Sequence, residues 1–365
     1  MSIALECAAR GRGAVEPNPT VGAVLARDGT ELARGWHKRF GWPHAEVEAL
    51  AAVAEAGHDA HGATMYVTLE PCCHIGKTPP CTRALIEAGV SRVVAAMEDP
   101  DSRVAGKGFA ELRQAGIEVT VGVMQAAARE LLAPYAKLRT RGRPWVICKW
   151  AQTADGRLAL PPDQGRWISS PASREEAHRL RGLCDGVCVG IGTVLADDPL
   201  LTNRSGAGRQ PTRVVLDSRL RLPPACWLVQ TAGAAPVMVA TTPEAAAANA
   251  ALVQPLRQGG IEVLELPRGP GGIDLGGLLD ELGRRQWTYL LVEGGEKVLR
   301  SFLYGGLADE MVVFISPHRV APGAGGPVLD IAGVAADLRA EAVQERRFGP
   351  DQMRRLRLAK GPGGA

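Results

Sequence analysis

Apolar and polar positions in the first part of the chain follow two different spacings in turn. Short runs rich in β-branched residues predict strands, and apolar positions that recur every three or four residues predict helices. The predicted strands are 21–25, 64–69, 92–96 and 119–121, and the predicted helices are 45–56, 82–88, 108–115 and 125–136. This alternation predicts an α/β domain of three layers, with a sheet between two layers of helices.

A second series of apolar runs begins at residue 145 and has the same mixed character. The predicted strands are 145–150, 186–190, 213–217, 236–241, 262–266, 289–293 and 310–316, and a helix is predicted over 296–304. The sequence therefore predicts a second α/β domain.

The segment 137–144 (KLRTRGRP) between the two series is basic and contains glycine and proline. Such a segment predicts a solvated linker. A chain of 365 residues is also too long for one ordinary domain. We therefore place a boundary near residue 143, with one domain over 1–143 and the other over 144–365.

Composition and charge narrow the class of protein. The net charge is only +3, which gives no electrostatic reason to expect binding to nucleic acid or to a membrane surface. Residues 1–9 lack the features of a signal peptide, and no uncharged apolar run approaches the roughly 18 residues of a membrane span. The eight cysteines show no framework spacing, which favours free thiols in a reducing cytosol. We expect a cytoplasmic protein.

Three residues form a candidate metal site. His44, Cys72 and Cys81 offer one imidazole and two thiols, which suit zinc and leave a fourth tetrahedral position for water. Zinc lowers the pKa of a bound water to about 7. Glu46 would carry the proton of that water to a ring nitrogen and to the departing amine. The order H-x-E, then P-C, then a second cysteine is typical of zinc-dependent nucleobase deaminases.

Two other interpretations of these residues stay open at this point. The cysteines and the histidine could be buried side chains that bind no metal. Alternatively, Cys73 or His74 could supply a fourth ligand and close a structural zinc site. Glu46 argues against the closed site, because a structural zinc has no use for a free carboxylate beside it.

The first half resembles a known family in three segments, which are 18–22 (NPTVG), 44–46 (HAE) and 66–81 (YVTLEPCCHIGKTPPC). They look like the N-terminal deaminase of the bifunctional riboflavin-biosynthesis deaminase–reductases. The eight residues between the two cysteines separate this branch from cytidine and tRNA-adenosine deaminases. This chain has Cys73-His74-Ile75 where the family often has Ser-His-His. The resemblance implies a cytidine-deaminase-like fold, with zinc ligands His44, Cys72 and Cys81, proton shuttle Glu46, base contact Asn18, and Lys77 and Thr78 near the substrate.

The second half resembles the reductase half of the same family. The matching segments, in the family's order, are 149–151 (KWA), 155–157 (DGR), 167–169 (WIS), 192–199 (GTVLADDP), 217–218 (DS) and 292–295 (VEGG). That half is similar in fold to dihydrofolate reductase, which binds NADPH without the fingerprint G-x-G-x-x-G. The resemblance therefore accounts for segment 190–195, which lacks the third glycine. From the residues alone, Gly294-Gly295 between a predicted strand and helix suit the close approach of a phosphate, and a plain tight turn is the other interpretation.

The resemblance also assigns residue roles in the second half. It implies NADPH contacts at Ala151, Trp167, Thr193, Asp197, Ser218 and the turn that begins at Gly295. It implies contacts to the phosphoribosyl intermediate at Arg181, Leu201, Arg204 and Glu293. Arginines suit a phosphate because their planar fork pairs bidentately and stays charged. The proton donor stays open among Lys149, Asp155, Asp197 and Glu293.

The resemblance implies two consecutive reactions on one chain. Zinc-dependent deamination of 2,5-diamino-6-(5-phosphoribosylamino)pyrimidin-4(3H)-one precedes NADPH-dependent reduction of the ribosyl group of 5-amino-6-(5-phosphoribosylamino)uracil. The partners are these small molecules, and the family's reductase halves suggest a homo-oligomer, a dimer or a tetramer. Two rival interpretations are a different nucleobase deaminase with an unrelated second domain, and a zinc-stabilised pyrimidine-binding regulatory protein.

Overall fold

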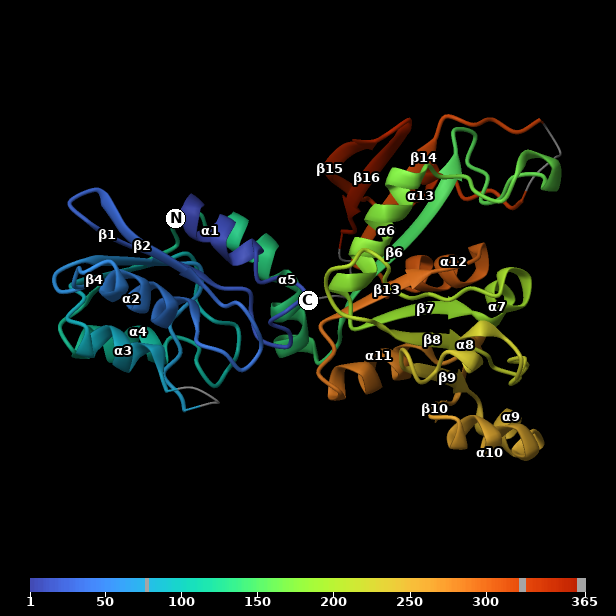
Figure 1. The fold of residues 1–365 in the computed structure, drawn as a ribbon, viewed down its shortest axis with the longest axis horizontal. Helices are drawn as coiled ribbons and strands as arrows, with labels where there is room; N and C mark the ends of the chain where they lie inside the picture. Colours follow the sequence, from blue (N-terminus) through green and yellow to red (C-terminus); the bar gives the residue numbers. More distant parts are fainter. Residues whose placement is uncertain (76–78, 322–325, 360–365) are drawn as a thin grey trace. The chain divides into compact units, whose positions relative to one another are not determined.

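The computed structural model describes residues 1–75, 79–321 and 326–359 of the chain. It divides into two compact units, Met1–Gly142 and Arg143–Ala365, and each contains its own sheet (Figure 1). Each unit also has its own cluster of buried apolar side chains. Lys77 and Thr78, which we expected near the substrate, lie outside the described residues.

The first unit is built on a five-stranded sheet with the strand order β2-β1-β3-β4-β5. β1 pairs antiparallel with β2 and β3, whereas β3, β4 and β5 run parallel to one another. The strands are β1 (Gly22–Arg27), β2 (Thr30–Trp36), β3 (Thr64–Val67), β4 (Arg92–Ala95) and β5 (Glu118–Val121).

Helices cover both faces of this sheet, as the sequence predicted. α1 and α5 lie on one face, and α2, α3 and α4 lie on the other (Figure 1). The helices are α1 (Ser2–Ala9), α2 (Ala45–Glu55), α3 (Cys81–Glu87), α4 (Lys107–Gln114) and α5 (Gln125–Arg141). The fully buried Leu25, Met65, Leu85 and Leu132 belong to the core between these layers.

The expected linker over 137–144 is wrong for most of its length. α5 continues through the basic run to Arg141 and ends at Gly142, whose φ of 63° is left-handed. Leu138 in this last turn is buried, and basic side chains near a helix C-terminus interact favourably with the helix dipole. The run of charge therefore belongs to the last turns of a packed helix.

The second unit is built on a nine-stranded sheet with the order β10-β9-β8-β7-β13-β6-β14-β16-β15. The strands from β10 to β14 in this order are parallel, and β16 and β15 are added antiparallel at one edge. The strands are β6 (Trp145–Thr153), β7 (Gly186–Gly190), β8 (Thr212–Leu216), β9 (Val237–Thr241), β10 (Ile261–Glu265), β13 (Tyr289–Glu293), β14 (Glu310–Ser316), β15 (Glu341–Phe348) and β16 (Asp351–Arg357).

Helices and one small hairpin connect these strands. The helices are α6 (Pro171–Leu183), α7 (Ile191–Asp197), α8 (Trp227–Gln230), α9 (Pro243–Ala248), α10 (Ala250–Gln258), α11 (Leu275–Arg284), α12 (Glu296–Tyr304) and α13 (Ile331–Asp337), with a 3-10 turn η1 (Pro162–Gln164). The hairpin consists of β11 (Arg268–Gly269) and β12 (Gly272–Ile273). None of the helices in the described ranges is both long and apolar enough to cross a membrane.

The apolar pattern did not reveal every strand. β2 begins with exposed Thr30 and Glu31, and every residue of β15 except Phe348 is exposed. Strands at a sheet edge bury little side-chain surface, so their sequences lack the alternation that marks a half-buried strand.

One buried carboxylic acid gives the first unit a pH-dependent stability. Asp99 is buried and accepts hydrogen bonds from the Asp101 N–H (2.9 Å) and the Tyr135 hydroxyl (3.1 Å). Burial raises the pKa of Asp99 from 3.8 to about 6, although both hydrogen bonds oppose this. Folding therefore favours the protonated form. The resulting stabilisation is fully present below pH 3.8 and is lost as the pH rises through about 6.

We predict that Asp99→Asn removes this loss, because an amide oxygen can accept both hydrogen bonds without charge. A difference of about two in pKa corresponds to about 3 kcal/mol in the unfolding free energy. Native-state hydrogen exchange of core amides in β4 should show the wild type losing stability between pH 4 and 7 relative to the variant. Asp101→Asn is the control. Arg103 lowers the pKa of Asp101 to about 2, so the stabilisation from Asp101 is lost as the pH falls, which is the opposite direction to that of Asp99. Parallel pH profiles of wild type and Asp99→Asn would contradict the prediction.

Candidate active sites

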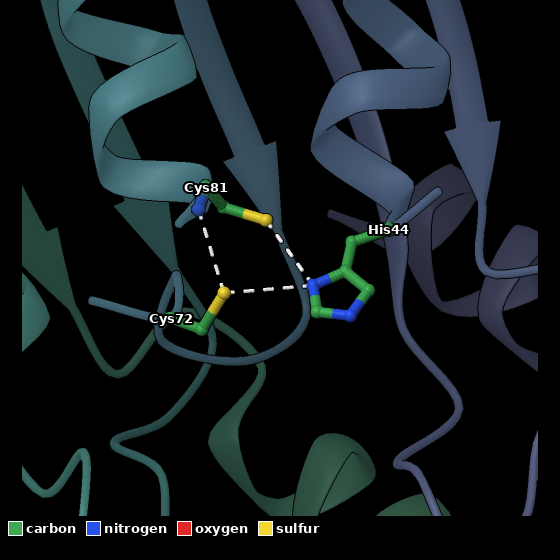
Figure 2. Close-up of side chains that lie close together, drawn as sticks. All are labelled: His44, Cys72 and Cys81. Atoms are coloured by element: carbon green, nitrogen blue, oxygen red, sulfur yellow. Dashed lines mark hydrogen bonds between the residues drawn. The ribbon is translucent and has the colours of Figure 1, made fainter. Parts of the chain in front are cut away.

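The structure brings His44, Cys72 and Cys81 together from three elements. His44 is the residue before α2, Cys72 follows β3, and Cys81 is the first residue of α3. Figure 2 shows the His44 Nδ1 atom facing both sulfurs, at 3.5 Å from Cys72 Sγ and 3.3 Å from Cys81 Sγ. The three ligand atoms all lie within 4.8 Å of one another.

These separations fit a single zinc ion. Bonds of about 2.0–2.3 Å in a tetrahedron place neighbouring ligand atoms roughly 3.3–3.8 Å apart. Among the described residues, the cluster contains these three ligands and neither Cys73 nor His74. The protein residues that the structure describes therefore leave one tetrahedral position open, which disfavours the closed structural site.

Main-chain groups hold Cys72 against the start of α3. The Cys81 N–H donates to Cys72 Sγ at 3.4 Å, and the Thr82 N–H donates to the Cys72 carbonyl oxygen at 3.2 Å. The free amides and dipole at a helix N-terminus favour a thiolate. Hydrogen bonds from Cys81 and His44 lower the pKa of the Cys72 thiol, and the same pairing with burial raises that of Cys81.

A buried carboxylate fixes the segment before Cys72. Glu70 accepts three main-chain hydrogen bonds, from Asp99 (3.1 Å), Gly106 (2.9 Å) and Phe109 (3.2 Å). Two of these donors belong to the start of α4, which has no capping side chain of its own. Glu70 thus caps α4 from outside and ties that helix to the metal-binding segment.

Glu46 lies in the first turn of α2 and is buried. Burial raises its pKa to about 7, and the nearby Cys72 adds to this increase. A bound divalent cation would act in the opposite direction, because it favours the carboxylate. A carboxyl group whose pKa lies near neutrality can both accept and release a proton.

Asn18 is connected to this cluster through His37. The Asn18 Nδ2 atom lies 3.2 Å from His37 Nε2, and the His37 ring meets the His44 ring edge-on with centroids 5.2 Å apart. Burial lowers the pKa of His37. Sequence reasoning missed His37, because its contact with Asn18 joins residues 19 positions apart.

In the second unit, the structure pairs two of the expected substrate residues with each other. Arg181 on α6 donates to both oxygens of Glu293 at the end of β13, at 3.1 and 2.6 Å. Burial alone would raise the pKa of Glu293, but Arg181 and Lys149 outweigh it and lower the pKa to about 2. Lys149 stands opposite Glu293 in the adjacent strand, and burial lowers the pKa of its ammonium group.

The loop after α7 carries the other two expected substrate residues. Leu201 is buried, and its φ of 53° is left-handed. This backbone conformation is energetically unfavourable for a residue with a bulky side chain. The next residue, Thr202, presents its carbonyl oxygen to Arg181 (3.1 Å) and to the His178 ring (3.2 Å). Burial and the nearby Arg181 lower the pKa of Arg204. Because Arg181 is already paired with Glu293, an anion at this loop would meet chiefly the guanidinium of Arg204.

A second group of residues fits a dinucleotide phosphate at the carboxyl ends of β7, β8 and β13. Cβ atoms added to Gly294 and Gly295 would lie 3.8 and 4.0 Å from the Thr193 hydroxyl, so this hydroxyl borders the turn before α12. Gly271 and Gly272 of the small hairpin border Ser301 and Ser218 in the same way, at 3.8 and 3.5 Å. Free helix amides, hydroxyls and open glycines suit the pyrophosphate of NADPH.

The remaining expected cofactor residues are not joined to this group by the contacts described. Trp167 is exposed, with the guanidinium groups of Arg166 and Arg174 at 5.2 and 5.0 Å from its ring. The carbonyl oxygen of Asp197, at the end of α7, accepts a hydrogen bond from Arg166. Ala151 lies in β6 opposite Phe314 of β14.

Comparison with known proteins gives matches over both halves. The cytidine and deoxycytidylate deaminase zinc-binding region matches residues 1–97, and the RibD C-terminal domain matches residues 144–353. The riboflavin biosynthesis protein RibD of Aquifex aeolicus is 42% identical over 352 residues, which cover 96% of this chain and 95% of that protein.

Solved structures agree over nearly the whole chain. RibD of Acinetobacter baumannii superposes with a TM-score of 0.83 at 35% identity, covering 98% of this chain and 97% of that one. The diaminohydroxyphosphoribosylaminopyrimidine deaminase/5-amino-6-(5-phosphoribosylamino)uracil reductase of Thermotoga maritima gives 0.82 at 34% identity, with the same coverage. The predicted fold class of both halves and the predicted family are confirmed. The chain belongs to the RibD family, the bifunctional deaminase–reductases of riboflavin biosynthesis.

Proposed function

We propose that residues 1–143 deaminate 2,5-diamino-6-(5-phosphoribosylamino)pyrimidin-4(3H)-one and that residues 144–365 reduce the ribosyl group of the product to ribityl. The single observation that carries the first step is the convergence of three zinc-type ligand atoms beside a buried glutamate. The family's two cofactors are zinc and NADPH.

In the first half, His44, Cys72 and Cys81 would hold the metal. When bound, zinc supplies a Lewis acid that activates water for attack on the ring carbon bearing the amino group. Glu46 would take one proton from that water and deliver it to the ring nitrogen, and would then carry the second proton, from the newly attached hydroxyl, to the amine that leaves as ammonia. The buried position of Glu46 supports this role, because exclusion of bulk water keeps the transferred proton within the site.

In the second half, Thr193, Ser218 and the turn from Gly295 would hold the cofactor, together with Ala151, Trp167 and Asp197. When bound, NADPH supplies the hydride. Arg181, Leu201, Arg204 and Glu293 would hold the phosphoribosyl substrate. Because Arg181 already shares two hydrogen bonds with Glu293, we assign the main phosphate contact to Arg204.

The charges in this half narrow the candidates for the proton donor. Arg181 and Lys149 outweigh burial and lower the pKa of Glu293 to about 2, and hydrogen bonds outweigh burial and lower the pKa of Asp155, so both are ionised at neutral pH. Lys149 is a cationic acid whose pKa is lowered by burial. Among the residues considered, Lys149 is therefore our choice of proton donor, with Asp197 as the alternative.

We also propose that the protein acts in the cytoplasm as a homo-oligomer, a dimer or a tetramer. The eight free cysteines support a reducing compartment. The resemblance to the family's reductase halves supports self-association, and β15 leaves an exposed strand at one edge of its sheet.

A coupled assay tests the two activities. The zinc-loaded protein is given the diaminopyrimidinone phosphoriboside with NADPH, and ammonia release and NADPH absorbance are followed together. We expect NADPH consumption to begin only after deamination. No ammonia release by folded, zinc-loaded protein would refute the proposed first step.

We predict that Glu46→Gln keeps zinc but loses deamination, because a glutamine cannot accept and return the proton. Loss of a general acid–base group lowers turnover by about 10²–10⁴-fold. Reduction of separately supplied deaminated intermediate should continue at the wild-type rate. Loss of both activities in a folded variant would contradict the assignment of one reaction to each half.

We predict that Cys81→Ser abolishes stoichiometric zinc binding, whereas Cys73→Ser retains it. Cys73 adjoins the ligand Cys72 but lies outside the cluster of ligand atoms, so it is a matched control. Zinc per chain is measured by mass spectrometry after dialysis. Equal zinc loss in both variants would show that Cys73 is also a ligand.

We predict that Arg204→Ala raises the KM for the phosphoribosyl intermediate by about tenfold to a hundredfold, as expected when a charge-assisted hydrogen bond is lost. The KM for NADPH should not change. Arg179→Ala is the control, because Arg179 lies on the exposed face of α6 and pairs with Glu175 and Glu176. An equal effect of both substitutions would rule out the assigned phosphate contact.

A further inference from the structure

The ring of His37 contacts the side-chain amide of Asn18. The residue is only 2% exposed, and each of its ring nitrogens has one polar neighbour. Nδ1 lies 2.9 Å from the carbonyl oxygen of Pro43, and Nε2 lies 3.2 Å from Asn18 Nδ2. One edge of the ring therefore faces an acceptor, and the other faces a donor.

These two neighbours determine the tautomer of the ring. A carbonyl oxygen can only accept, so Nδ1 carries the hydrogen and donates to Pro43. An amide nitrogen can only donate, so Nε2 presents its lone pair to Asn18. The neutral ring with its hydrogen on Nδ1 satisfies both contacts, whereas the tautomer with its hydrogen on Nε2 satisfies neither.

The backbone of Asn18 is also fixed. Its N–H donates to the Val15 carbonyl oxygen at 2.9 Å, and the preceding carbonyl, of Pro17, accepts from Arg139 at 3.0 Å. The remaining freedom that matters is a half-turn of the terminal amide, which would exchange its oxygen and nitrogen. The lone pair of His37 Nε2 selects the orientation with the nitrogen toward the histidine.

That orientation leaves the Asn18 oxygen as an acceptor. No donor among the described residues is hydrogen-bonded to Asn18 Oδ1, although the residue is half-buried. His37 also packs edge-on against His44, so His37 contacts both Asn18 and one residue of the candidate metal cluster.

We propose that His37, in its Nδ1–H tautomer, is a positioning residue that makes Asn18 accept, rather than donate, a hydrogen bond from the pyrimidine. The site then selects a ring edge that carries an N–H or amino donor. This inference rests on the proposed deaminase function, in which Asn18 contacts the base.

His37 acts through Asn18 and not on the reacting atoms, so its effect should fall on substrate binding. A site that pairs a buried polar group with a substrate hydrogen discriminates strongly once that pairing is lost. A histidine that only fills space beside His44 would instead change metal retention when it is replaced.

A matched pair of substitutions separates these two roles. In His37→Gln, the longer amide can place its oxygen where Nε2 lies and still accept from Asn18. In His37→Asn, the shorter amide can donate to Pro43 but does not reach Asn18. We expect His37→Asn to raise the KM for deamination about tenfold or more, while His37→Gln stays within about threefold of wild type.

Zinc content and the reduction of supplied intermediate are measured on the same samples and should equal the wild-type values. Equal KM values for the two variants would overturn the inference, and so would a rise in KM that merely follows zinc loss. A wild type that releases no ammonia would instead refute the proposed deaminase function, so the two failures can be told apart.

The tautomer is tested directly on zinc-loaded wild-type protein by ¹⁵N NMR of the histidine rings. His37 is identified by the signals missing from His37→Gln. A pyrrole-type shift at Nδ1 and a pyridine-type shift at Nε2 would support the inference, and the reverse pattern would overturn it. This measurement does not require His37→Asn to fold.

Discussion

The first unit depends on a buried carboxylate that has no cationic partner in its hydrogen bonds. Glu70 is satisfied by three main-chain N–H groups, and two of them belong to the start of α4. A buried charge is tolerated only when its hydrogen-bonding capacity is filled, so the segment around α4 has to stay in place. Cys72 follows Glu70 by two residues, so the hydrogen bonds of Glu70 also restrict the position of Cys72.

The second unit also contains a buried carboxylate, Glu293, but stabilises it with a cationic side chain. Glu293 is the last residue of the parallel strand β13, and the guanidinium of Arg181 neutralises it. Arg181 is anchored in turn to the carbonyl of Thr202, in the loop that carries Leu201 and Arg204. In each half, a buried carboxylate fixes a neighbouring segment that bears candidate site residues: Glu70 lies two residues before Cys72, and Glu293 is joined through Arg181 to the loop of Leu201 and Arg204. Side chains from different loops can converge there because the loops that follow parallel strands meet at one edge of the sheet.

Local sequence was sufficient to predict the features that depend on a single short segment of the chain. A helix was expected over 82–88, directly after Cys81, and Gly294-Gly295 were expected between a strand and a helix; the structure has α3 from Cys81 and the glycines between β13 and α12. The candidate ligands His44, Cys72 and Cys81 could be chosen from residue chemistry and order, and the structure brings them together. The extent of α5 was missed because Lys137 to Arg141 look solvated, while the buried face that keeps them helical depends on a single leucine, Leu138.

Contacts between distant segments could not be predicted in this way. Arg181 and Glu293 are 112 residues apart, and no local pattern shows that they form one ion pair. The partnership of His37 with Asn18 was not visible in the sequence, because the pairing of β1 with β2 is what brings the residues before β1 close to those after β2. The exposed strand β15 was missed because a strand that buries almost no side chains has no pattern of apolar residues in its sequence.

The full length of α5 matters for anyone who wishes to separate the two halves. The helix ends at Arg141 and β6 begins at Trp145, so only Gly142, Arg143 and Pro144 lie between packed elements. A cut at residue 136, where the charge pattern suggests a tether, would remove buried Leu138 and the Arg139 side chain that holds the carbonyl of Pro17. Dissection at that point would remove a hydrogen bond that holds the segment before Asn18 in the first unit. A stand-alone deaminase has to extend through Arg141.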